Sequence, residues 1–257
     1  MRCGLGVDIP SNHLYQVNPL DALIHALGSD LLAIYDSSRG AVVVPGGIST
    51  WREARGTGDD LFAGTGEAPQ LGADKSVYFD TTERLLISLP ASTFGFQPGQ
   101  PRWMGIIGCA QNDEATVKQM IYVAADQSLM GVRVYGQEVG LMQLYEWIAY
   151  VTGTPGTYYL NPATVAGSIG QRRLIIASFT PLAEAVFQIP DGYASTGAII
   201  AGDVTETTAT LSLGDINEGG PTQMKFWTVV FCQGGTEPTV DQMTALRKYA
   251  THLGVMF

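Results

Sequence analysis

The sequence predicts an all-β protein with a short helix near its N-terminus and an amphipathic helix at its C-terminus. Charged residues make up only 15% of the 257 residues, too few for the charged faces of a helical bundle. The 31 glycines and 13 prolines separate short apolar stretches, with turn signals at intervals of about 8–12 residues. No linker or shift in composition divides the chain. This pattern is typical of one β-sandwich or β-barrel.

The N-terminal region, residues 1–29, is expected to form an arm and a short helix ahead of a β domain that comprises residues 30–257. Residues 1–17 lack periodicity, and we expect this arm to pack on a neighbouring copy of the chain, because 46% of all residues are apolar. The candidate subunit contacts are its apolar residues Leu5, Val7, Ile9 and Leu14. A helix is predicted over residues 19–27, since Pro19 suits a first turn and Gly28 follows the end.

Short apolar or alternating stretches predict the strands. They lie at residues 31–35, 41–44, 77–79, 85–89, 104–110, 120–125, 129–135, 139–151, 173–179, 198–201 and 208–213. Two pairs of neighbours are expected to form hairpins, 77–79 with 85–89 and 120–125 with 129–135. Residues 46–70 are interpreted as a long loop whose large anchor is Trp51. The stretch 139–151 is apolar on both sides, so a buried helix stays open beside the favoured strand.

The C-terminal region carries the clearest pattern, a buried strand followed by a capped helix. Strict alternation over residues 224–232 predicts one face with Met224, Phe226, Val230 and Cys232, and an opposite face with Trp227, Val229 and Phe231. Thr239 and Gln242 have the spacing of a capping box, and Gly254 is suited to a left-handed helix end. The predicted apolar face of this helix contains Val240, Met243, Leu246, Tyr249 and Leu253.

Composition argues against several classes of partner. The net charge of −10, with no offsetting basic run, argues against nucleic acid. No stretch of 18 apolar residues is present, so we expect no membrane insertion, and the N-terminus lacks the apolar core of a signal peptide. The three cysteines and three histidines have no metal-ligand spacing, so we expect no metal and no cofactor. Cys109 and Cys232 are predicted to be buried.

Several motifs, in order, resemble those of concanavalin A-like (laminin-G-like) jelly-roll domains. They are Trp51-Arg52-Glu53, Ala68-Pro69-Gln70-Leu71, Val77-Tyr78-Phe79-Asp80, Glu83-Arg84-Leu85-Leu86 and the final strand and helix over residues 226–254. Arg172 and Arg173 stand where the family has Trp-His, and Thr81 stands where Gly is usual. The resemblance implies a jelly-roll β-sandwich of two antiparallel sheets. Many such domains occur in bacteriophage tail and capsid-associated proteins.

Candidate functional residues are those that suit sugar binding. The enzymatic branch of the family uses a Glu-x-Asp-x-x-Glu strand, which this sequence lacks, so no catalytic residue is assigned. Aromatic rings beside amide or charged groups suit sugar hydroxyls. The candidate glycan-binding residues are Tyr158, Tyr159 and Asn161 in one cluster, and Trp51 and Arg52 in another.

We therefore expect a non-enzymatic structural component of a bacteriophage or prophage particle, in its tail, fibre or capsid decoration. Its location would be the virion, and its partners would be other virion proteins, copies of itself and host-surface polysaccharide. Two alternatives stay open, a glycan-cleaving enzyme with carboxylates from distant strands and a cytosolic carbohydrate-binding module. Cleavage of a glycan would favour the first alternative, and retention on a glycan without product would favour the second.

Overall fold

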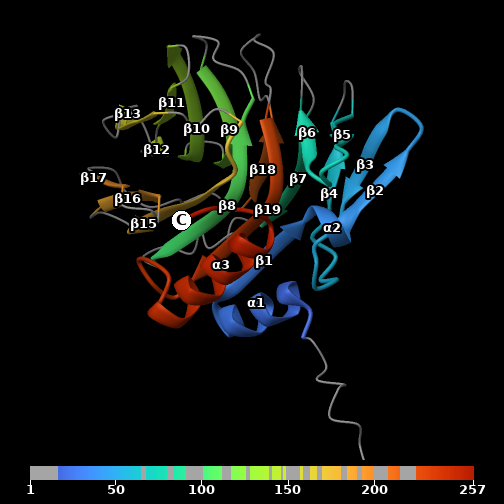
Figure 1. Ribbon diagram of the computed structural model, residues 1–257, viewed down its shortest axis with the longest axis horizontal. Coiled ribbons are helices and arrows are strands. Elements are labelled where there is room, and N and C mark those ends of the chain that lie inside the picture. Colours follow the sequence, from blue (N-terminus) through green and yellow to red (C-terminus); the bar gives the residue numbers. More distant parts are fainter. Residues whose placement is uncertain are drawn as a thin grey trace, which may run out of the picture.

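The computed structural model describes residues 17–64, 68–79, 84–90, 101–111, 117–125, 128–138, 141–145, 147–148, 157–158, 163–166, 170–180, 184–189, 193–198, 208–214 and 224–257. These residues form two large antiparallel sheets, one two-stranded sheet and a few helices (Figure 1). The predicted β-sandwich of two antiparallel sheets is confirmed, as are the helices near its two ends. No helix in the described part of the chain has the length and apolar character that crossing a membrane requires.

The first sheet has eight strands, with the C-terminal strand at its centre. They are β1 (Leu31–Asp36), β5 (Gln70–Leu71), β6 (Val77–Phe79), β8 (Arg102–Ala110), β15 (Arg173–Thr180), β16 (Glu184–Ile189), β17 (Tyr193–Ala198) and β19 (Met224–Gln233). Their order is β17-β16-β15-β8-β19-β6-β5, and β1 also pairs with β19. One edge of β19 thus pairs with β8, while its other edge pairs first with β6 and then with β1.

The second sheet has nine strands, ordered β14-β11-β10-β9-β18-β7-β4-β3-β2. They are β2 (Ala41–Val44), β3 (Gly47–Trp51), β4 (Leu61–Ala63), β7 (Arg84–Pro90), β9 (Val117–Ala125), β10 (Ser128–Glu138), β11 (Leu141–Tyr145), β14 (Ala163–Ala166) and β18 (Thr208–Gly214). The two-stranded sheet pairs β12 (Trp147–Ile148) with β13 (Thr157–Tyr158). The predicted hairpin of β9 and β10 is confirmed. Where it is described, the stretch 139–151 is strand, as favoured.

Two expectations about the connections are wrong. The stretches 77–79 and 85–89 do not form a hairpin, because β6 belongs to the first sheet and β7 to the second. Alternation of apolar residues indicates a strand, but it does not say which sheet the strand joins. The predicted loop at residues 46–70 contains β3, β4 and β5, strands of two to five residues that are too short to show periodicity. The connection between β1 and β2 is one helical turn, α2 (Ser37–Gly40), capped by Asp36. Of the strand predicted at 198–201, β17 ends at Ala198, and residues 199–201 lie outside the described residues.

Aromatic side chains form part of the core between the sheets. The Tyr35 ring of β1 lies edge-to-face against the Trp51 ring of β3, with centroids 6.1 Å apart, and against Phe231 of β19 at 6.5 Å. Phe79 of β6 meets Phe226 of β19 at 5.6 Å in the same manner. All five side chains are buried, so these edge-to-face pairs add to the apolar area that holds the layers together.

A β-bulge in β19 changes the face to which its second half points. Its partner residue on β8 shifts between Phe226 and Thr228, so Trp227 is the extra residue. Trp227, Val230 and Cys232 pack together on the helix side of the sheet, and Phe231 packs into the sandwich. The predicted grouping of Val230 and Cys232 with Phe226 is therefore wrong, because strict alternation does not hold across a bulge. The burial predicted for Cys109 and Cys232 is confirmed.

Two helices cover the outer face of the first sheet. Figure 1 shows α1 (Pro19–Leu27) and α3 (Val240–His252) on the side of β1, β8 and β19 that faces away from the second sheet. The 3₁₀ turn η1 (Gly28–Asp30) joins α1 to β1. The capping box of Thr239 and Gln242 is formed in both directions, at 3.3 and 2.9 Å, and Gly254 has a φ of 89° as predicted.

The buried face of α3 differs from the predicted apolar face at its first residues. Leu246 and Tyr249 are buried as predicted, whereas Val240 is 82% exposed. Gln242 is buried instead, because its side-chain amide donates to Asp30 Oδ2 at 2.9 Å as well as closing the capping box. A polar side chain can thus occupy the buried face when each of its groups is hydrogen-bonded.

Candidate functional site

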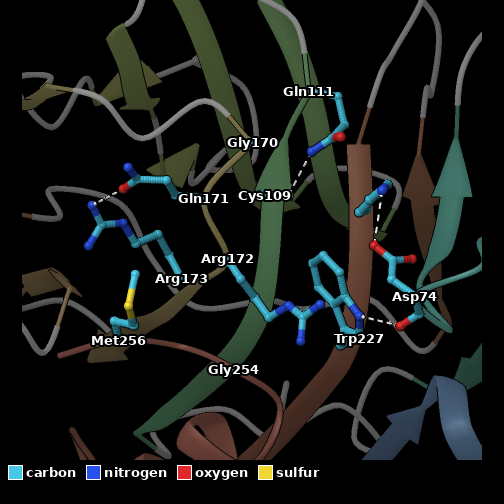
Figure 2. A pocket seen from close by; sticks show the side chains of 11 residues that line it. Asp74, Cys109, Gln111, Gly170, Gln171, Arg172, Arg173, Trp227, Gly254 and Met256 are labelled. Carbon is cyan, nitrogen blue, oxygen red and sulfur yellow. Dashed lines mark hydrogen bonds and ion pairs between the residues drawn. The ribbon is translucent and has the colours of Figure 1, made fainter.

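A pocket of about 430 Å³ opens on the outer face of the first sheet, beside the end of α3 (Figure 2). Several separate segments contribute to its wall: the turn before β6, the end of β8, the start of β15, the beginning of β19 and the tail after α3. The lining residues are Asp74, Cys109, Gln111, Gly170, Gln171, Arg172, Arg173, Lys225, Trp227, Gly254 and Met256. Since β15, β8 and β19 are neighbours in the sheet, their pairing brings these distant segments together.

The wall of the pocket is built on Trp227, whose side chain points to the outer face of β19 as that of Lys225 does. The Arg172 guanidinium carbon lies 3.6 Å from the centroid of the Trp227 ring, within the range of a cation–π contact. The Trp227 indole N–H donates to the backbone carbonyl of Asp74 at 3.1 Å. Figure 2 shows the guanidinium beside the indole, with Asp74 on the other side of the ring. Trp227 is only 3% exposed, so a ligand in the pocket meets Arg172 rather than the face of the indole.

Gly254 lies close against Arg172. A Cβ added to Gly254 would lie 3.4 Å from Arg172 Nη1, and the φ of 89° is one that glycine adopts without strain. Because the indole lies against its face and the tail after α3 lies near Nη1, the guanidinium of Arg172 is restricted in position.

Asp74 and Lys225 form an ion pair at the pocket, with an N–O distance of 3.0 Å. Asp74 Oδ1 also accepts from the backbone N–H and the hydroxyl of Ser76, at 3.2 and 2.6 Å. Burial alone would raise the pKa of Asp74, but the hydrogen bonds from Ser76 and Lys225 outweigh it and lower the pKa below its usual 3.8. Asp74 is therefore ionised at neutral pH and offsets the charge of Lys225.

Arg172 has no such acidic partner. Among the described residues, no carboxylate forms a hydrogen bond or ion pair with its guanidinium. Burial lowers the pKa of Arg172, but a guanidinium stays charged at neutral pH because its ordinary pKa is above 12. The pocket thus presents a half-buried positive charge to which no described carboxylate is hydrogen-bonded, while the charge of Asp74, on the other side of the indole (Figure 2), acts on it only through space.

Two amides supply neutral polar groups. The Gln111 side chain donates to Cys109 Sγ at 2.8 Å, and Gln171 accepts from the Arg173 guanidinium at 2.8 Å. Burial raises the pKa of the Cys109 thiol to about 11, so this group is uncharged at neutral pH. The arrangement suits binding of a polar, anionic molecule. Among the lining residues described, Asp74 is the one carboxylate, so they do not form the carboxyl pair of most glycoside hydrolases.

The described candidate residues Trp51, Arg52 and Tyr158 are not among the residues that line this pocket. Trp51 is fully buried in the core against Tyr35, so its ring offers no exposed face to a sugar, while Arg52 is exposed. Tyr158 belongs to β13, opposite Trp147, and Tyr159 and Asn161 lie outside the described residues. None of the described lining residues belongs to either predicted cluster. No three His, Cys, Asp or Glu side chains are grouped to hold a metal ion in the part of the chain that the structure describes.

Sequence reasoning missed the pocket, although signals for it were present. Arg172 and Arg173 are adjacent in a chain with only 14 lysines and arginines, and they depart from the family pattern at that point. Lys225 is a charged residue within an otherwise apolar strand. These charges could not be placed together from the sequence, because nothing in it shows that β15 and β19 both flank β8.

Comparison with known proteins places the chain by its fold. No protein-family model matches the sequence, and no curated protein matches it. Among solved structures, a Trypanosoma rangeli sialidase in complex with 2,3-difluorosialic acid has a TM-score of 0.58 at 9% identity, over 88% of this chain and 34% of that chain. The binding domain of botulinum neurotoxin DC, in complex with rat synaptotagmin II, has a TM-score of 0.57 at 7% identity, over 87% of this chain and 52% of that chain.

A botulinum neurotoxin type C structure is similar at a TM-score of 0.53 and 7% identity, over 79% of this chain and 49% of that chain. The chain therefore spans about a third of the sialidase and about half of each toxin chain. At these identities the likeness concerns architecture alone. The protein has the lectin-like β-sandwich fold that these domains share.

Proposed function

We propose that the protein is a non-enzymatic carbohydrate-binding β-sandwich, and that the pocket at Arg172 and Trp227 holds the carbohydrate. One observation carries this proposal. The Arg172 guanidinium is fixed on the Trp227 ring inside a polar pocket, and no described carboxylate is paired with it. A guanidinium that is partly removed from water gains from hydrogen-bonding an acceptor, and a bound polar ligand would supply one where no described carboxylate does.

The chemistry of the remaining lining residues supports a polyhydroxylated ligand. Sugar hydroxyls both donate and accept hydrogen bonds, and the amides of Gln111 and Gln171 and the Asp74–Lys225 pair offer both kinds of group. The similar structures give independent support. They include a Trypanosoma rangeli sialidase in complex with sialic acid and a botulinum neurotoxin type C whose cell entry depends on interaction with two ganglioside molecules.

A glycan-cleaving enzyme is the second candidate, because sialidases share the fold. The binding function is preferred on the character of the lining residues. Asp74 is paired with Lys225 and hydrogen-bonded by Ser76, so its pKa is lowered, whereas a general acid needs a raised pKa. The described lining residues also include no histidine.

The biological setting that we propose is a bacteriophage or prophage particle, with host-surface polysaccharide as the ligand and other virion proteins as partners. Its support is the resemblance of the sequence motifs to jelly-roll domains of such particles. The arm residues Leu5, Val7, Ile9 and Leu14 lie outside the described residues, and their contact with a second copy is part of this proposal. Tail or capsid genes on both sides of the gene would support the setting, and metabolic genes there would contradict it.

A glycan array probed with the full chain tests the proposed function. We expect retention on a subset of glycans and no shortening of those glycans on incubation. Arg172→Gln should weaken retention about tenfold or more, since a hydrogen bond to a charged group is worth about 1.5–3 kcal/mol. Arg39→Gln is the matched control, because Arg39 pairs with Asp21 on the surface away from the pocket. Equal retention of the two variants would contradict the site, and release of cut glycan would favour the enzyme.

A further inference from the structure

We infer that the pocket selects sugars that carry a carboxylate, and that the Arg172 guanidinium binds this carboxylate. The inference rests on the proposed carbohydrate function and specifies the class of ligand. It is carried by the charge of the pocket, the restricted position of Arg172 and the engagement of Lys225 by Asp74.

The charge of the pocket is opposite in sign to that of the whole protein. Its described lining residues include three cations, Arg172, Arg173 and Lys225, against one carboxylate, Asp74. The chain as a whole carries 24 acidic and 14 basic residues, a net charge of −10. A local excess of positive charge in an acidic protein attracts an anionic ligand and disfavours a neutral one of the same shape.

Between Lys225 and Arg172, Arg172 is the cation that is placed to receive the anion. The Lys225 ammonium is already neutralised by Asp74 at 3.0 Å, and the hydrogen bonds to Asp74 keep that carboxylate ionised. This pair can hydrogen-bond sugar hydroxyls without a net charge. The guanidinium of Arg172 has no acid opposite it among the described residues, so the charge selectivity of the pocket is concentrated there.

The packing of Arg172 favours a planar anion. The guanidinium carbon lies over the Trp227 ring at 3.6 Å from its centroid, and the five N–H donors of a guanidinium lie in one plane. Two parallel in-plane N–H groups match the two coplanar oxygens of a carboxylate. The cost of fixing the guanidinium has been met before binding, because Trp227 and the backbone at Gly254 already hold it.

The experiment compares pairs of glycans that differ only at the carboxyl group. Sialylated and uronic acid oligosaccharides are measured beside carboxyl-reduced counterparts, in which –COOH is replaced by –CH₂OH, and beside sulfated neutral oligosaccharides. With the unaltered protein we expect carboxyl reduction to weaken binding about tenfold or more. Arg172→Gln should bind the acidic and reduced forms equally, whereas Arg39→Gln should keep the preference. Arg172→Lys keeps the positive charge but not the planar donors. This variant should lose most of the preference for the acidic over the carboxyl-reduced glycans.

The outcomes separate the inference from the function on which it rests. If the unaltered protein binds acidic and carboxyl-reduced forms equally, the inference is overturned and the carbohydrate function stands. A preference for sulfated over carboxylated glycans would also overturn it. Binding to no glycan at all would overturn the proposed function and the inference together. Because the comparison of native and reduced glycans uses the unaltered chain, the result does not depend on whether a variant folds.

Discussion

Removing the hydroxyl of Tyr249 tests how α3 is held on the first sheet. This hydroxyl donates to Asp36 Oδ2, and Asp36 is only 1% exposed at the end of β1. Asp36 also accepts from the backbone N–H and hydroxyl of Ser38, at 3.0 and 2.5 Å, and from the Thr228 hydroxyl at 2.8 Å. The carboxylate at the end of β1 therefore receives donors from α2, β19 and α3, and so connects these elements.

The expected cost of Tyr249→Phe follows from this geometry. The ring keeps its packing because phenylalanine has the same shape, so the change removes the hydrogen bonds of the hydroxyl, of which the one to the Asp36 carboxylate is the charged one. Hydrogen bonds with a charged partner are worth about 1.5–3 kcal/mol, and at 3% exposure of Tyr249 water cannot readily replace the missing donor. We expect the free energy of unfolding to fall by about 2 kcal/mol at pH 7.

The effect of Tyr249→Phe should also depend on pH. Burial, followed by the charge of Asp36, raises the pKa of Tyr249 far above its usual 10. A group with a raised folded-state pKa contributes stability that is present below its unfolded pKa and is lost above it. The difference between the two proteins should therefore be constant from pH 7 to 9 and should shrink as the pH rises above 10.

Urea denaturation followed by circular dichroism measures both effects. Tyr35→Phe is the matched control, because the Tyr35 hydroxyl donates at 2.6 Å to the neutral backbone carbonyl of Asp59. Its loss should cost about 1 kcal/mol, less than that of Tyr249. A loss below about 0.5 kcal/mol for Tyr249→Phe, or a larger loss for Tyr35→Phe, would refute the reasoning.

Three further predictions concern the helix packing, the arm and the charge. Leu246→Ala should cost about 2–5 kcal/mol in denaturant titrations, because Leu246 is 1% exposed within the helix–sheet cluster; less than about 0.5 kcal/mol would show that this face is not packed. Deletion of residues 1–17 should lower the oligomer mass measured by light scattering and leave the circular dichroism spectrum unchanged, and a full-length protein that is monomeric at high concentration would contradict the proposed subunit contact. A gel-shift titration at moderate salt should show no retention of DNA or RNA, whereas micromolar binding that weakens as salt rises would overturn the argument from net charge.

The features that could be predicted from the sequence are those encoded by neighbouring residues. The start and end of α3 follow from Thr239, Gln242 and Gly254, which lie within or just beyond the helix that they define. The strand at the centre of the first sheet follows from its unbroken apolar run. The β-bulge in this strand could not be predicted, because the shift of register at Trp227 appears only in the pairing with β8.

The pocket could not be predicted, because its residues are brought together by the order of strands in the sheet. Asp74, Arg172 and Trp227 are far apart in the sequence, and they meet because β15, β8 and β19 are adjacent. Trp51 shows the opposite error. A tryptophan in a Gly-rich stretch suits either an exposed platform or an anchor, and only the contact with Tyr35 decides that it is an anchor. The division of the chain at residues 29 and 30 stays a prediction.

The most direct test of the account is the indole N–H resonance of Trp227 during titration with an acidic oligosaccharide that the protein retains. The chain has four tryptophans, and loss of one peak in Trp227→Phe assigns the resonance. A ligand carboxylate bound to Arg172 would change the electric field at the Trp227 indole, which lies against Arg172. It would also change the field at the hydrogen bond from the indole N–H to the Asp74 carbonyl. We predict a saturable shift of the Trp227 peak while the Trp51 peak stays in place. Saturated binding with an unmoved Trp227 peak would contradict the account and would direct attention to the cluster of Tyr158, Tyr159 and Asn161.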